Sequence, residues 1–133
     1  MPKPRQTPPT QRLLRGRRAY AAGQGAEALA AEALAAEGWT LLGQRIRTGA
    51  GEIDLIAERQ GLLAFIEVKA RPSLAEAAFA LGPRQRARLI VAAEAWLAEH
   101  PGHGAAGMRF DVMLVAADGT IRRIADAFRV EES

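Results

Sequence analysis

The 133-residue sequence contains no cysteine, which excludes disulfide bonds, zinc–thiolate sites and thiol catalysis. No apolar run approaches the ~20 residues that a membrane-spanning helix needs, and the N-terminus lacks the apolar segment of a secretory signal. Aromatic residues make up only 5% of the chain, too few for extensive stacking on single-stranded bases. We therefore expect a cytoplasmic protein without a membrane partner or a small-molecule cofactor.

Acidic residues are missing from residues 1–18, although this stretch holds six basic residues. Because the whole chain carries a formal charge of +3, those six leave residues 19–133 with a net charge of −3. The stretch suits either an arm that contacts phosphates or a disordered, solubilising leader. Four prolines among its first nine residues interrupt any helix. We expect a disordered basic tail over residues 1–17 and one domain over 18–130.

The spacing of apolar residues and turn signals predicts the element order α-β-β-β-α-β-β. A helix is expected over residues 18–37, firm from about Gly25, and a second over 73–100 with a break at Gly82-Pro83. The expected strands cover residues 39–47, 52–57, 62–70, 109–116 and 120–124. This order predicts an α/β fold in which a mixed sheet of about five strands is flanked by helices.

Two carboxylates, Asp54 and Glu67, are each flanked by apolar residues within expected strands. Asp54 lies in the second expected strand, and Glu67 and Lys69 lie in the third. If Gln60-Gly61 is a two-residue turn, Arg59 pairs with Leu62 and Asp54 lies directly opposite Glu67. A four-residue turn makes the pair diagonal, and in both registers strand alternation leaves Asp54 and Glu67 on one face. Glu52 is expected on that face beside Asp54 and Lys69 beside Glu67, while Ile53 and Leu55 are expected on the opposite face.

Opposed like charges destabilise a sheet unless something offsets them. A divalent cation would do so, and Mg²⁺ fits best because it commonly takes one or two protein carboxylates and keeps other positions for water and phosphate. Mn²⁺ is the alternative ion. Lys69 is one of only two lysines among 18 basic residues, and its compact charge suits the orientation of an attacking water. The competing interpretation is that Glu67 and Lys69 lie at a solvated strand end and that Asp54 forms a surface salt bridge with an arginine.

The segments Gly51-Glu52-Ile53-Asp54-Leu55-Ile56-Ala57 and Phe65-Ile66-Glu67-Val68-Lys69-Ala70-Arg71 closely resemble the YraN (UPF0102) family of uncharacterised bacterial proteins. The resemblance runs from about Gly25 to Val115. That family is grouped with the PD-(D/E)xK endonuclease-like fold of Holliday-junction resolvases and restriction enzymes. The resemblance therefore implies a restriction-endonuclease-like core.

The resemblance also implies roles for individual residues. Asp54 and Glu67 would be metal ligands with the Val68 carbonyl as a third, and Lys69 would be catalytic. Glu27 matches the acid that such nucleases add from a helix, and Gln85 matches a glutamine that contacts substrate or site in some relatives. Glu27 and Gln85 could equally be ordinary residues on a helix surface. The sequence departs from the family pattern at Arg45, where asparagine is usual, and at Ala70, where threonine is common.

The leading hypothesis is an Mg²⁺-dependent endonuclease acting on DNA, including structured or branched DNA. Its phosphate contacts would be Arg15, Arg17, Arg18, Arg84, Arg86 and Arg88. A non-catalytic nucleic-acid-binding module that keeps the nuclease fold is the main alternative, and an acidic surface that docks a partner protein is the third. A homodimer is compatible with the resemblance, because junction-cleaving relatives work as dimers.

Overall fold

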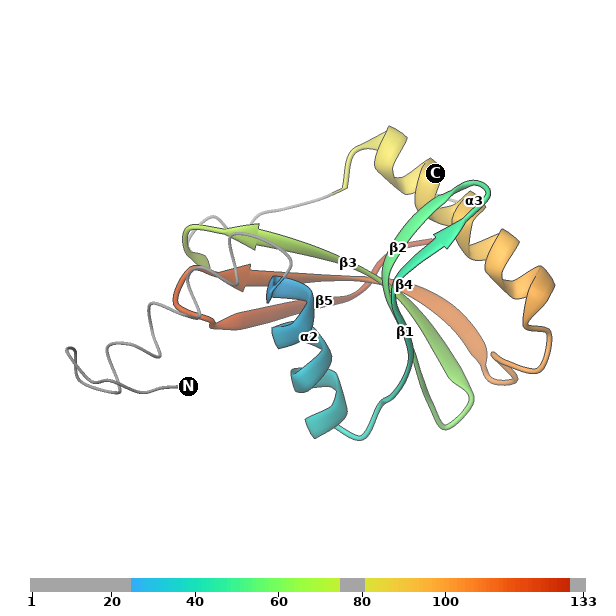
Figure 1. Ribbon diagram of the computed structural model, residues 1–133, viewed down its shortest axis with the longest axis horizontal. Coiled ribbons are helices and arrows are strands. Elements are labelled where there is room, and N and C mark those ends of the chain that lie inside the picture. Colours follow the sequence, from blue (N-terminus) through green and yellow to red (C-terminus); the bar gives the residue numbers. More distant parts are fainter. Residues whose placement is uncertain (1–24, 75–80, 130–133) are drawn as a thin grey trace.

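The computed structural model describes residues 25–74 and 81–129. Five strands form one mixed sheet in the order β1-β2-β3-β4-β5, and helices α2 and α3 cover its opposite faces (Figure 1). The elements are α2 (Gly25–Ala36), β1 (Thr40–Thr48), β2 (Gly51–Arg59), β3 (Leu62–Arg71), α3 (Pro83–Glu99), β4 (Gly107–Ala116) and β5 (Ile121–Phe128). The predicted α/β class and element order are confirmed.

The β2–β3 hairpin turns through two residues. Gln60 and Gly61 have φ angles of 54° and 81°, the positive values at both central positions that favour tight hairpins. Arg59 pairs with Leu62, and the antiparallel register continues to Leu55 and Ile66. The two-residue alternative of the sequence prediction is therefore the correct one.

Strands β3 and β4 are parallel, so the chain crosses over between them, and α3 lies in that crossover. The helix expected from residue 73 is corrected, because Ser73 is not helical and α3 begins at Pro83. Gly82 before it is extended, with φ −69° and ψ 164°, as favoured for a residue that precedes proline. Proline suits the first helical turn because it has no N–H to leave unpaired there.

Each face of the sheet carries its own buried cluster. Phe65 and Phe110 pack with Trp96 of α3 on one face, with ring centroids 6.0 Å apart for Phe65 and Trp96. Ile66 and Met113 pack with Leu34 of α2 on the other face. Burial of each large apolar side chain contributes about 1.5–3 kcal/mol, so both helices are held to the sheet. No helix within residues 25–74 and 81–129 is long and apolar enough to cross a membrane.

Candidate metal centre

The ladder between β2 and β3 stops just before Asp54. The β2–β3 ladder ends with Leu55 and Ile66, and at the next position Asp54 Oδ2 accepts a hydrogen bond of 2.7 Å from the Val68 backbone N–H. The expected ladder pair of Asp54 with Glu67 is thus replaced by a contact from side chain to backbone. Ile53 and Leu55, expected on one face, lie in the clusters on opposite faces. The alternation of β2 is therefore broken at Asp54, and the Asp54 carboxylate is held against β3 by the Val68 N–H.

Arg45 on β1 lies beside this break. Its neighbours Gln44 and Ile46 pair with Leu55 and Ile53, so Arg45 stands across from Asp54. Its φ angle is 50°, a left-handed conformation that non-glycine residues rarely adopt. Arg45 Nε lies 3.6 Å from Oε1 of Glu27. The irregular backbone of β1 thus places a guanidinium group at the acidic site.

A cavity of about 300 Å³ opens beside the break. The hairpin supplies Glu52, Asp54 and Glu67 to its lining, and α3 supplies Gln85, Arg88 and Leu89. Within this site Lys69 Nζ lies 2.9 Å from Glu67 Oε2, and both side chains are about one-fifth exposed (20% and 21%). The structure thus brings Asp54, Glu67 and Lys69 together and adds Gln85 from the second helix.

Glu27 reaches the same site from the first turn of α2. Burial raises the pKa of the Glu27 carboxyl; Arg45 opposes this rise, while Glu52 and Glu67 add to it. Its Oε1 is buried and accepts no hydrogen bond from the described residues. A buried acceptor without a donor is costly, and the Arg45 guanidinium 3.6 Å away offsets this cost through its charge rather than through a hydrogen bond.

The ionised form of Asp54 is also disfavoured. Burial, together with the charges of Glu67 and Glu27, raises the pKa of the Asp54 carboxyl from 3.8 to about 7. The Val68 N–H and the Lys69 ammonium act in the opposite direction. Two acids thus lie close to one partly buried carboxyl, and pKa shifts of this kind are frequent at functional sites.

The donor set suits a hard cation that keeps several waters. Asp54 and Glu67 offer carboxylate oxygens, and the Val68 carbonyl is the predicted third ligand. In residues 25–74 and 81–129, no three acidic or histidine side chains are already arranged to hold a metal together. Mg²⁺ needs no full protein cage, because it is usually bound by one or two carboxylates with water and phosphate completing the shell.

Comparison with known proteins identifies the family. The uncharacterised protein family UPF0102 matches residues 26–115. The chain belongs to the UPF0102 family. A UPF0102 protein of Granulibacter bethesdensis is 58% identical over 122 residues, covering 92% of this chain and 77% of the relative. A UPF0102 protein of Azorhizobium caulinodans is 47% identical and covers 98% of this chain and 97% of the relative.

The UPF0102 match contains the whole acidic site, from Glu27 to Gln85. Among the predicted phosphate contacts, Arg84 and Arg88 are exposed on α3, and Arg88 also lines the cavity. Arg86 instead turns back, and its Nη1 donates to the Leu81 carbonyl at 2.7 Å. The remaining predicted contacts, Arg15, Arg17 and Arg18, lie outside the described residues, as does the expected basic tail.

Sequence reasoning gave Arg45 no place in the site. The signal that could have found it is the β1–β2 register, which sets Arg45 across from Asp54. That register could not be predicted from side-chain alternation, because the pairing of β1 with β2 shifts between Leu41 and Gly43. Glu52 was expected on the face of Asp54, and it does line the cavity, with Oε2 3.9 Å from Nε of Arg47.

Proposed function

We propose that this chain is a divalent-cation-dependent endonuclease that hydrolyses phosphodiester bonds in DNA, with structured or branched DNA as its substrate class. One observation carries the proposal. Asp54 lies with Glu67 in one cavity next to the Lys69 ammonium, and its carboxyl has a pKa of about 7. A nearby cation would strongly stabilise the ionised form of such a carboxyl. Membership of UPF0102 does not itself indicate an activity, since the family is uncharacterised.

Each residue of the site has a role in this proposal. Asp54, Glu67 and the Val68 carbonyl hold Mg²⁺ or Mn²⁺. The bound cation supplies positive charge that offsets the negative charge developing on the phosphate. Lys69, now paired with Glu67 at 2.9 Å, orients the attacking water or neutralises phosphate charge. Glu27 helps to fix the water from the α2 side of the site.

Substrate contacts come from α3. Gln85 and Arg88 line the cavity, and the exposed Arg84 lies one turn before Arg88 on the same helix. Guanidinium groups pair well with phosphates, and this attraction weakens steeply with salt. The proposal places the enzyme in the cytoplasm and includes a homodimer, because cutting both strands of a branched DNA needs two sites.

A second function remains in the proposal as an alternative: a nucleic-acid-binding module without catalysis. One observation favours it, since no three acidic or histidine side chains in the described parts of the chain form a prearranged metal group. This alternative predicts DNA binding that is independent of divalent ions and unaffected by Lys69→Met.

Cleavage assays separate the two functions. The full chain is incubated with duplex, flap, four-way-junction and single-stranded DNA in Mg²⁺ or Mn²⁺. The endonuclease proposal predicts cleavage of at least one substrate, lost by ~100-fold or more in Asp54→Asn and Lys69→Met. Glu32→Gln, which removes an exposed acid on α2, is the matched control and keeps full activity. Absence of cleavage of every substrate with either ion, despite DNA binding, supports the non-catalytic alternative.

A further inference from the structure

One tryptophan ring is surrounded by three guanidinium groups. The Cζ atoms of Arg59, Arg109 and Arg123 lie 4.8, 5.2 and 5.5 Å from the ring centroid of Trp39. These arginines belong to β2, β4 and β5, and Trp39 is only 3% exposed. Guanidinium groups from three separate strands thus lie around one ring, beside the C-terminal end of α2. We call these four residues the Trp39 cluster.

Carboxylates neutralise only part of this charge. Arg123 Nη2 lies 2.9 Å from Glu37 Oε1, and Arg109 Nε lies 3.0 Å from Asp111 Oδ1. Arg59 Nη1 donates to the uncharged backbone carbonyl of Glu37 at 2.9 Å. Three cations with two anionic partners leave one formal positive charge. The cluster is therefore suited to one further anion.

Two buried hydrogen-bond donors in the cluster are unpaired within the described part of the chain. Trp39 Nε1 and Arg123 Nη1 are both buried, and neither has a hydrogen-bond partner among the residues that the structure describes. Indole and guanidinium nitrogens are donors only. Because unpaired buried donors cost free energy, a hydrogen-bond acceptor bound at these nitrogens would stabilise the cluster.

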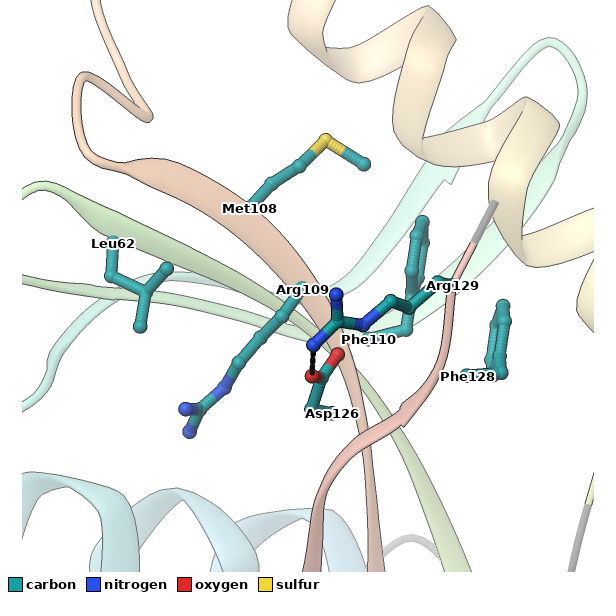
Figure 2. A pocket seen from close by; sticks show the side chains of 7 residues that line it. All are labelled: Leu62, Met108, Arg109, Phe110, Asp126, Phe128 and Arg129. Atoms are coloured by element: carbon teal, nitrogen blue, oxygen red, sulfur yellow. Dashed lines mark hydrogen bonds and ion pairs between the residues drawn. The ribbon is translucent and has the colours of Figure 1, made fainter. Parts of the chain in front are cut away.

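Two arginines of the cluster each contribute to the lining of a cavity, although Trp39 and Arg123 line neither of the two. Arg109 lines a cavity of about 480 Å³ together with Asp126 and Arg129, and Figure 2 shows its side chain extending away from those two residues. Arg59 and Glu37 line a second cavity of about 800 Å³. The side chains of Arg109 and Arg123 are 21% and 22% exposed. A small ligand can therefore reach the exposed parts of these two arginines from solvent.

We propose that the Trp39 cluster binds an oxyanion of the phosphate class. A phosphate group carries several acceptor oxygens on one centre, which lets it take N–H groups from different arginines and from the indole at once. The phosphate comes from a nucleic-acid backbone or from a small phosphorylated molecule. Leu55 and Ala57 of β2 face the cluster's side of the sheet with α2, whereas the acidic cavity is lined by α3. The two sites share no residue, so this inference stands without the nuclease proposal.

The indole N–H of Trp39 offers a direct reporter. The chain has only two tryptophans, so a ¹⁵N-labelled sample gives two indole signals, assigned with Trp39→Phe. Titration of the full chain with inorganic phosphate is expected to shift the Trp39 signal and leave that of Trp96, which packs on the α3 face, in place. Arg123→Gln is expected to weaken the apparent affinity about tenfold or more, since it removes a charged donor.

Arg122→Gln is the matched control. Arg122 is exposed and adjacent on β5, so the substitution changes the net charge equally and should leave the titration unchanged. The same titration with a short DNA duplex identifies the source. A Trp39 shift with both probes indicates a backbone phosphate, and a shift with phosphate alone indicates a small phosphorylated ligand. If neither probe shifts the Trp39 signal of the wild-type chain, or if Arg122→Gln weakens binding as much as Arg123→Gln, the proposal is wrong.

Discussion

The backbone N–H of Val68 donates a 2.7 Å hydrogen bond to Oδ2 of Asp54. This contact lies between the last paired residues of the β2–β3 ladder, Leu55 and Ile66, and the acidic cavity. It fixes the Asp54 carboxylate close to β3, where Glu67 and Lys69 flank Val68. Substitution with asparagine keeps an acceptor for this N–H, so charge and geometry can be tested separately.

Asp54→Asn is expected to stabilise the metal-free protein at high pH. The pKa of this carboxyl is 3.8 ordinarily and about 7 in the folded chain, so the folded state binds the proton more tightly. The contribution of Asp54 is thus fully present below about pH 4 and is lost as the pH rises through 7. After allowance for solvent screening, the variant should gain about 1–3 kcal/mol near pH 8.

Urea unfolding in EDTA at about pH 4.5 and 8 measures this difference. The gap between variant and wild type should widen with pH, whereas Glu32→Gln should show little change. A gap that stays constant between the two pH values would contradict the raised pKa of Asp54.

Metal affinity should depend on the same proton. A cation that binds the ionised Asp54 must displace a proton below a pH of about 7. The apparent Kd for Mg²⁺ is therefore expected to rise about tenfold for each pH unit below that value and to level off above it. Calorimetry in buffers with different ionisation enthalpies measures both the affinity and the protons released. An affinity that does not change across pH 5.5–8 excludes Asp54 as a ligand of this kind.

Arg45→Asn should not destabilise the fold, although it removes the 3.6 Å contact with Glu27. Arg45 has a φ angle of 50°, and asparagine tolerates the left-handed region better than arginine. We expect the free energy of unfolding to change by between zero and about +1 kcal/mol. Arg47→Asn is the control, because Arg47 lies on the same strand with its side chain 89% exposed. A loss of more than about 1 kcal/mol in Arg45→Asn alone would show that its contact with Glu27 outweighs backbone strain.

The hairpin was predictable because its determinants are local. Gln60-Gly61 sets the turn, and the turn sets the register from Arg59 with Leu62 to Leu55 with Ile66. The predicted alternation of side chains along β3 is also confirmed, since Phe65 and Ile66 lie in the clusters on opposite faces of the sheet. Period-two reasoning therefore placed Glu67 and Lys69 on one face correctly.

The sequence predictions were wrong where contacts between segments distant in the chain determine the backbone conformation. The break at Asp54 depends on Arg45 in β1 and on the N–H of Val68 in β3, neither of which a two-residue period can include. The Trp39 cluster joins residues of three strands and has no sequence motif. Gly82-Pro83 did mark a helix boundary, but only the structure shows that the helix begins there.

Asp111→Ala should cost about 3–5 kcal/mol of stability. Asp111 is fully buried (0% exposed), pairs with Arg109 and accepts the Asp126 N–H at 2.9 Å, where β5 is irregular with a φ of 54°. Its removal leaves a partly buried guanidinium and a backbone donor unpaired. Guanidinium chloride unfolding measures the loss, with the exposed Glu94→Ala as control. A cost below about 1 kcal/mol would mean that water replaces the carboxylate.

The central claim is that Asp54 and Glu67 form a divalent-cation site. Isothermal titration calorimetry of the full chain with Mg²⁺ and with Mn²⁺, near pH 8, tests it without knowledge of the substrate. The account predicts saturable binding of one ion per chain to wild type and to Glu32→Gln, and at least ~10-fold weaker binding to Asp54→Asn and Glu67→Gln. Equal binding to all four proteins, or no binding to wild type with either ion, would contradict it.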